Sequence, residues 1–181
     1  EKDHHFPGLY FQVSFIINPS GDVILKYRRL ISMFAPTPYD VLDKYLDIYG
    51  EDALFPVAKT EIGNLAAIAS EEILYPEISR ALALRGAEVI CHSSSEITSP
   101  ILTPKNIAKQ ARAYENNFYI VSANSAGISG TYLPQHSADG DSKIIDFHGA
   151  VISHAAHGES MAAFAELDVT NLRHTRRRPG M

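Results

Sequence analysis

The stretch that most constrains the fold is residues 62–96, in which two apolar runs are separated by a polar corner and a helical pattern. The first run, residues 62–69, predicts a strand, and the second, residues 87–95, predicts a buried strand. Between them, residues 76–86 predict a helix, because proline is favoured in the first helical turn and glycine just beyond the last one. The corner at residues 70–72 therefore lies where a strand ends and a helix follows.

The corner consists of Ser70, Glu71 and Glu72. A hydroxyl at the end of a strand is exposed and lies beside backbone N–H donors, an arrangement that suits nucleophilic acyl transfer. In the structural alternative, the serine and the carboxylates cap the following helix, whose N-terminal dipole favours negative charge. Side chains alternate along an extended corner, so at most one of the two glutamates is expected to approach Ser70.

Short runs of β-branched, aromatic and other apolar residues predict further strands. They are residues 13–18, 23–28, 118–123, 143–147, 150–154 and 161–167. A turn cluster at residues 19–22 joins the first two into a hairpin, and residues 35–50 predict a surface loop with a short helix. Thr103 and Pro104 predict the start of another helix. This alternation, followed by a short meander, predicts an α/β fold with a mixed sheet.

The composition excludes several classes of protein. A formal net charge of −5 on 181 residues argues against a general nucleic-acid binder, and the basic run at residues 176–178 is interpreted as a solvated tail. No apolar run approaches the roughly 18 residues that cross a bilayer. The single Cys91 cannot form an internal disulfide and fits a reducing, cytoplasmic setting. One domain is expected over residues 13–181, preceded by residues 1–12, to which no function is assigned.

Four blocks of the chain, in one order, resemble the nitrilase superfamily of carbon-nitrogen hydrolases, which includes nitrilases and aliphatic amidases. These blocks are residues 15–30, 62–96, 113–127 and 142–149. The resemblance covers nearly all of the chain and implies an α/β fold, a nitrilase-like α-β-β-α sandwich with mixed sheets. It also implies that the first part of the usual fold is absent, together with the glutamate that serves the family as general base.

The same resemblance implies a set of site residues. The nucleophilic cysteine of the family corresponds to Ser70, and its catalytic lysine, in a Tyr-Arg-Lys string, corresponds to Arg29. Glu71 follows the nucleophile position and is expected to offer its backbone N–H to an oxyanion. Substrate-binding positions are implied for Glu72, Asn124 and Ser125. No cofactor and no metal are implied, and the expected substrate is a small amide or nitrile.

Ser70 and Arg29 change the chemistry that the family implies. A thiol ionises near neutral pH, whereas a serine hydroxyl needs a base to remove its proton, and Glu71 or Glu72 is the candidate for that role. Arginine keeps the charge of lysine but spreads it over a bulkier planar fork. Three hypotheses follow: a hydrolase-like protein with impaired cysteine-type chemistry, a serine-dependent altered hydrolase, and a non-catalytic scaffolding or regulatory subunit. The third implies a homo-oligomer or a complementary chain.

Overall fold

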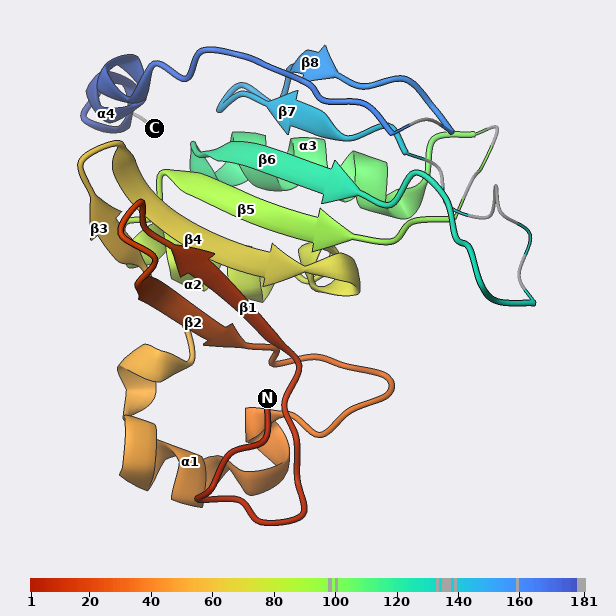
Figure 1. Ribbon diagram of the computed structural model, residues 1–181. Helices are drawn as coiled ribbons and strands as arrows, with labels where there is room; N and C mark the ends of the chain where they lie inside the picture. The colour runs from red at the N-terminus through yellow and green to blue at the C-terminus, as the bar shows by residue number, and fades with distance from the viewer. Residues whose placement is uncertain are drawn as a thin grey trace.

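The centre of the molecule is a six-stranded sheet whose strands lie side by side in sequence order (Figure 1). The computed structural model describes residues 1–97, 99, 101–132, 134, 138, 140–158 and 160–178. The strands of the sheet are β3 (Ala58–Thr60), β4 (Gly63–Ala69), β5 (Val89–Ser94), β6 (Tyr119–Asn124), β7 (Lys143–Ile145) and β8 (Val151–His154). β4, β5 and β6 run parallel and the other neighbours pair antiparallel, which confirms the predicted mixed sheet.

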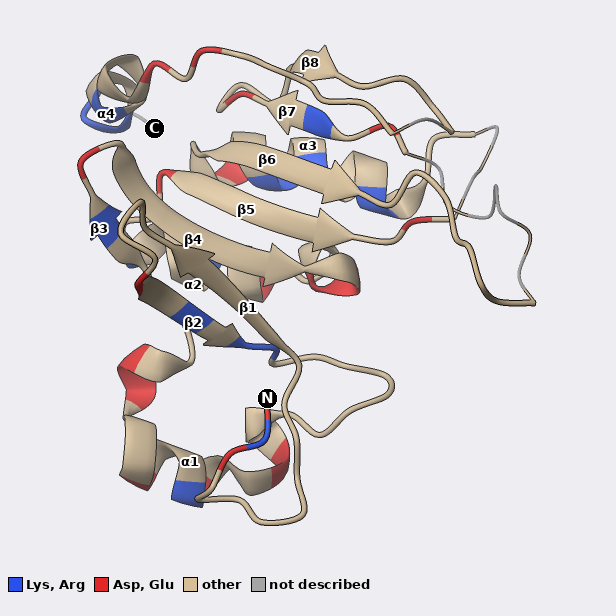
Figure 2. Ribbon diagram, in the orientation of Figure 1, with Lys and Arg blue, Asp and Glu red and all other residues tan. Residues whose placement is uncertain are grey.

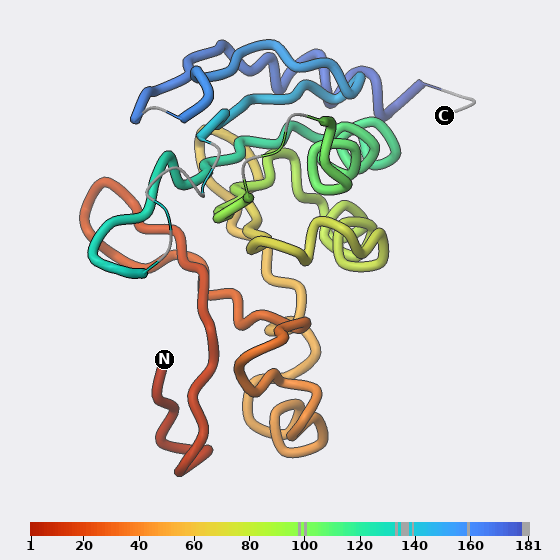
Figure 3. The backbone as a smooth tube through the Cα atoms, turned by 90° about the vertical axis from the view of Figure 1, so that its right-hand side faces the viewer, coloured from red at the N-terminus to blue at the C-terminus, as the bar shows by residue number. Residues whose placement is uncertain are grey.

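Two layers cover opposite faces of this sheet. Helices α2 (Pro76–Leu84) and α3 (Pro104–Asn116) lie on one face, and the antiparallel hairpin of β1 (Val13–Ile17) and β2 (Val23–Arg28) lies against β4 on the other (Figures 1 and 3). The hairpin was predicted from its turn cluster, and its strands begin at the expected residues. The layering places the ends of the parallel strands between the helices and the hairpin.

The main core forms between α2, α3 and the sheet because side chains alternate along each strand. Ile68, Ile90 and Ile120 occupy neighbouring strands and are fully buried. Leu82 of α2 and Ala113 of α3 belong to the same buried cluster. Apolar residues at every second position of the central strands thus bury one face against helices, as in other α/β proteins.

The boundaries of α3 follow local capping chemistry. The side-chain oxygen of Thr103 accepts a hydrogen bond from the backbone N–H of Asn106 at 3.2 Å, which satisfies one free donor of the first turn. Asn117 ends the helix in the left-handed conformation with a φ of 48°, a conformation that asparagine tolerates better than most residues. The predicted start of this helix is confirmed.

The strand expected near the end of the chain, over residues 161–167, is a wrong prediction. Residues 161–167 form no strand, and the side chains of Met161 and Phe164 are exposed, because this apolar run meets no strand to pair with. The helix α4 (Val169–Arg176) follows and begins at Asp168, whose carboxylate accepts from the N–H of Asn171 at 2.8 Å. Apolar composition alone therefore predicted the wrong element here.

Part of the basic run, predicted to be a solvated tail, instead anchors α4. The Arg176 guanidinium donates to the carbonyl oxygens of Ala87 and Asn117 at 2.7 and 2.8 Å. One turn earlier, Arg173 forms two hydrogen bonds of 2.6 and 2.9 Å with the Glu88 carboxylate. Residues 177 and 178 are exposed.

The N-terminal residues form a small cluster with α1 (Leu42–Tyr49), the short helix predicted within residues 35–50. Phe6 and Phe11 are buried against Tyr45 of this helix. The described residues also form three short 3-10 helices: η1 (Pro38–Val41), η2 (Glu51–Ala53) and η3 (Ser70–Leu74). The last of these is the corner that follows β4.

Candidate active site

Ser70 lies at the carboxyl end of β4, where the chain turns into η3. Its φ of 52° is in the left-handed region, which residues other than glycine rarely adopt. Such a conformation persists only where surrounding contacts fix it. The imidazole Nε2 of His92, on the neighbouring strand β5, lies 2.9 Å from the Ser70 carbonyl oxygen and supplies one such contact.

The hydrogen bonds of His92 define its protonation. A carbonyl only accepts, so Nε2 carries the hydrogen, and Nδ1, 2.9 Å from the Ser122 hydroxyl on β6, accepts from that hydroxyl. Burial lowers the pKa of His92 to about 4, so the ring is neutral at neutral pH. The parallel strands β5 and β6 thereby fix the corner at the end of β4.

Arg29 reaches the same corner from the end of the hairpin. Its guanidinium donates to the Glu71 carboxylate at 2.6 Å and to the Gln12 side-chain oxygen at 2.7 Å. Its Nε lies 3.7 Å from the second carboxylate, that of Glu72. The structure thus brings Arg29 together with both glutamates that follow Ser70, and the two terminal nitrogens of the guanidinium are already engaged.

Glu71 is held as a carboxylate. Burial opposes its ionisation, but hydrogen bonds from its own backbone N–H and from the Ser70 hydroxyl, and then the charge and hydrogen bond of Arg29, lower its pKa. The backbone N–H that was expected to serve an oxyanion therefore faces the carboxylate of its own residue. Of the two glutamates, Glu71 is the one whose side chain approaches Ser70, in line with the alternation expected along the corner.

Glu72 joins the hairpin to the corner. Its fully buried carboxylate accepts from the Tyr27 hydroxyl at 2.7 Å and from the backbone N–H groups of Leu30, Ile31 and Ala69 at 2.8 to 3.2 Å. Burial raises the pKa of Glu72 even though these hydrogen bonds favour the charged form. This position was expected to bind substrate, but its carboxylate binds neighbouring protein groups.

Asn124 and Ser125 lie at the end of β6. The Asn124 side chain accepts from the N–H of Glu96 at 2.7 Å and donates to the carbonyl of Gly140 at 2.8 Å. The backbone of Ser125 bonds to Ser94 and also to Gly140. Among the described residues, these bonds tie loops together and do not extend to Ser70, Arg29 or the two glutamates.

Two residues near Ser70 were missed in the sequence. His92 is a polar residue within an apolar strand, and its alternation with Ile90 placed it on the helix-facing side. Lys105 lies in the first turn of α3, and its Nζ lies 3.3 Å from the Ser70 Oγ. Its only sequence signal was its place directly after the predicted helix start. Figure 2 shows Lys and Arg positions along α3 and acidic positions at the end of β4.

A cavity adjoins the corner between the hairpin and the sheet. It has a volume of about 720 Å³, and the residues that line it include Gln12, Phe15, Lys26, Arg29 and Ser93. The cavity reaches Ala69, the residue before Ser70. The Lys26 ammonium in this lining is paired with the Glu1 carboxylate at 2.7 Å, so the cavity combines apolar groups with charges of both signs.

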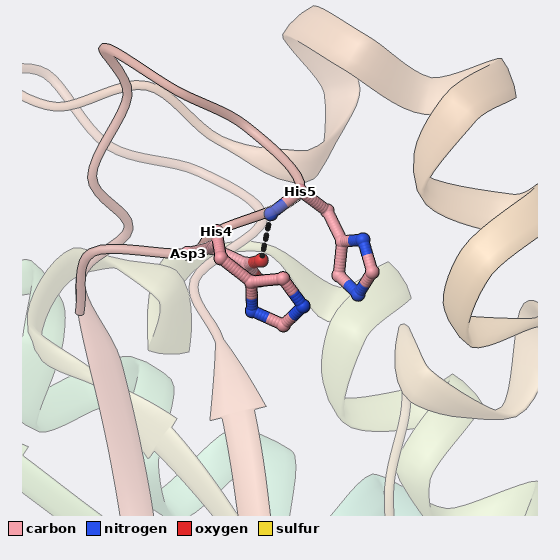
Figure 4. Close-up of side chains that lie close together, drawn as sticks. All are labelled: Asp3, His4 and His5. Carbon is pink, nitrogen blue, oxygen red and sulfur yellow. Dashed lines mark hydrogen bonds between the residues drawn. The ribbon is translucent and has the colours of Figure 1, made fainter.

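Asp3, His4 and His5 lie close together and resemble a metal site by residue type (Figure 4). The Asp3 carboxylate, however, accepts from the Arg28 guanidinium at 3.0 Å, from the Tyr49 hydroxyl and from the N–H of His5 at 3.0 Å. A cation at this carboxylate would meet the positive charge of arginine. The group is therefore better explained as an anchor between the N-terminal residues, the hairpin and α1.

A serine corner at the end of a parallel strand, in a mixed sheet layered between helices and a hairpin, defines an α/β protein. The chain belongs to the carbon-nitrogen hydrolase family, whose sequence pattern matches residues 2–177. The resemblance to the nitrilase superfamily is therefore confirmed.

Curated relatives include the human deaminated glutathione amidase, 27% identical over 166 residues that cover 90% of this chain and 49% of the relative. A formamidase from Bradyrhizobium sp. is 24% identical over 84% of this chain and 42% of its own length. The chain thus spans less than half the length of these two relatives.

Solved structures show the same fold. Saccharomyces cerevisiae Nit3 superposes with a TM-score of 0.71 at 20% identity, covering 94% of this chain and 58% of Nit3. The Caenorhabditis elegans NitFhit protein superposes with a TM-score of 0.72 at 22% identity. The match covers 97% of this chain and 42% of the NitFhit chain. Among the described residues, no helix has both the length and the apolar character needed to cross a membrane.

Proposed function

We propose that this chain carries an amide- or nitrile-directed acyl-transfer site in which ordinary cysteine-type chemistry is impaired. The amidase names of the curated relatives favour a small amide as the ligand class. Ser70 occupies the elbow where the family resemblance implies a cysteine. A serine hydroxyl reacts poorly unless a base removes its proton during attack.

The observation that carries the proposal is the engagement of Arg29. Its terminal nitrogens bind Glu71 and Gln12 at 2.6 and 2.7 Å. A cation that stabilises a developing oxyanion must be directed toward the space where that charge forms. The Glu71 N–H faces its own carboxylate. Two groups that would stabilise an acyl-transfer intermediate are thus committed to contacts within the protein.

Release of ammonia from a panel of small amides by the purified protein tests this proposal. We expect the wild-type chain and a Ser70→Ala variant to release ammonia at the same background rate. The panel should include formamide and short aliphatic amides, because the named relatives include a formamidase. Release that requires Ser70 would contradict the proposal.

A second candidate function, a scaffolding or regulatory subunit, is favoured by apolar side chains on the surface of the hairpin. Phe15, Ile17 and Val23 are 56%, 53% and 53% exposed. Exposed apolar side chains grouped on one surface favour contact with another protein surface. In this proposal, a second copy of the chain or a complementary chain covers the hairpin.

The mass of the particle in solution tests the second candidate. Light scattering after size-exclusion chromatography is expected to give more than one chain per particle. Replacing Phe15 by Ser should reduce that mass, whereas Tyr132→Ser, at an exposed position that is not part of the hairpin, should leave it unchanged. A stable wild-type monomer would rule out self-association as the way in which the hairpin is covered.

A further inference from the structure

The Ser70 hydroxyl lies between a hydrogen-bond donor and a hydrogen-bond acceptor. The Lys105 ammonium donates to Ser70 Oγ at 3.3 Å. The hydroxyl in turn donates to the Glu71 carboxylate, and this hydrogen bond helps to keep the carboxylate ionised. The oxygen therefore has a cation on one side, which favours negative charge on it, and on the other side an anion that can accept its proton.

The Glu71 carboxylate is itself oriented by a third side chain. The Arg29 guanidinium donates to this carboxylate at 2.6 Å and to the Gln12 side-chain oxygen at 2.7 Å. The same Gln12 oxygen accepts from the Ser32 hydroxyl at 3.1 Å. A nucleophile bonded to a base, with the base held by a third group, is the general arrangement that activates a protein hydroxyl.

The backbone of Ser70 is fixed in an uncommon conformation. Its φ of 52° is left-handed, and the His92 ring donates to its carbonyl oxygen at 2.9 Å. Residues other than glycine keep such a conformation only where surrounding contacts determine it, and such residues gather at functional sites. Ser70 is half-buried, so its hydroxyl is constrained by neighbours but is not enclosed.

We infer that Ser70 is acylated by activated acyl compounds, with Glu71 as the base. As the bond between Ser70 Oγ and the acyl carbon forms, the hydroxyl proton moves to the Glu71 carboxylate. The bond from the acyl carbon to the leaving group breaks, and its electron pair departs with the leaving group as an anion. Glu71 then releases the proton to water. The products are an ester at Ser70, the leaving-group anion and one proton in solution.

The strength of the base defines the class of acyl compound. The pKa of Glu71 is lowered although burial opposes its ionisation, so this carboxylate is a weak base at neutral pH. A weak base suffices where the leaving group departs readily, as in activated esters, thioesters and acyl phosphates, whereas the amine of an amide must be protonated to leave. The inference rests on the proposed acyl-transfer geometry at Ser70 and leaves the proposed impairment of amide hydrolysis unchanged.

Acetylation by 4-nitrophenyl acetate tests the inference, with intact-mass measurement of the protein and peptide mapping of the modified residue. The wild-type chain is expected to gain an acetyl group on Ser70. Glu71→Gln should slow that reaction at least about 10-fold, since general base catalysis contributes about 10²–10⁴-fold. Glu77→Gln removes the same charge at an exposed position of α2, and this matched control should react as the wild type does.

The pH dependence of acetylation separates a base from a structural role. With an ionised carboxylate as the base, the wild-type rate should be constant between about pH 6 and pH 8. His92, with a pKa of about 4, stays neutral over this range. In Glu71→Gln, hydroxide from the solvent must remove the proton, so the rate should rise roughly 10-fold per pH unit.

Three results would overturn the inference: wild-type rates in Glu71→Gln, the same pH dependence in the two chains, or no acetyl group on Ser70. Circular dichroism shows whether each variant is folded. If Glu71→Gln does not fold, the wild-type profile decides, because a rate that rises with pH throughout this range excludes a carboxylate base. An unreactive Ser70 would leave the proposed loss of amide hydrolysis standing. Ser70-dependent ammonia release would contradict only that earlier proposal.

Discussion

Single residues at the corner each have contacts that limit what Ser70 can do. Arg29 and Glu71 neutralise one another, and Glu72 is enclosed by donors from the hairpin and from β4. His92 fixes the backbone of Ser70, and Lys105 contacts its hydroxyl. The corner is therefore a rigid, polar structure in which one hydroxyl remains half-buried and in contact with an amine.

The depressed pKa of His92 predicts a pH dependence of stability. The folded value of about 4 lies below the ordinary 6.5, so the unfolded chain binds more protons between these pH values. The stability linked to the neutral ring is fully present above about pH 6.5 and is lost as the pH falls toward 4, by about 3 kcal/mol. At a pH above about 6.5, His92→Leu should lower the free energy of unfolding by about 1–3 kcal/mol, because the Ser70 carbonyl and the Ser122 hydroxyl lose their hydrogen-bond partner.

Urea unfolding of the wild-type chain and of His92→Gln between pH 4 and pH 7 measures this effect. Glutamine can donate to the Ser70 carbonyl but does not titrate. The free energy of unfolding of the wild-type chain should therefore fall more steeply toward low pH than that of the variant. The Asp and Glu carboxylates are the same in the two chains, so their contributions to the pH dependence of stability cancel in the difference between the two profiles. Parallel profiles would mean that His92 does not titrate as its burial implies.

At the scale of elements, α4 holds the ends of three others in place. Arg176 binds carbonyls at the start of β5 and at the end of α3, and Arg173 binds Glu88, which also accepts from the backbone N–H of Asn64 at 2.8 Å. The hydrogen bond from Arg173 lowers the pKa of Glu88. Charged donors at carbonyl groups that end a helix complement its dipole.

Arg176→Ala should lower the free energy of unfolding by about 1–3 kcal/mol, because the carbonyl oxygens of Ala87 and Asn117 lose a charged donor. Arg177→Ala is the matched control, since residue 177 is exposed in the same basic run and should change stability by no more than about 0.5 kcal/mol. Chemical denaturation gives both values. Hydrogen exchange should also become faster within residues 169–176 of the Arg176 variant. Equal effects of the two substitutions would contradict this role for α4.

At the scale of the whole molecule, the sequence predicted the parts that depend on local pattern. The hairpin, α3 and the parallel strands follow from turn residues, caps and apolar runs. It did not predict β3 or α4. Formation of α4 depends on contacts such as that between Arg173 and Glu88, which lie 85 residues apart. Local pattern does not contain such pairings.

The candidate site was predicted only in part for the same reason. Ser70, Arg29 and Glu71 were named from the family resemblance, and the structure brings them together. His92 lies 22 residues from Ser70 along the chain and reaches it through the pairing of β4 with β5. Lys105 lies 35 residues from Ser70 and reaches it through the packing of α3 against η3. Alternation along β5 is the one local signal for His92, because it puts this residue on the same face of the strand as Ile90.

The central claim is that the family fold is retained while cysteine-type amide hydrolysis is impaired at Ser70. Ammonia release from small amides, measured on the purified wild-type chain beside Ser70→Ala, tests it most directly. The account predicts equal background rates for the two proteins. A wild-type rate above background that is lost in Ser70→Ala would contradict it.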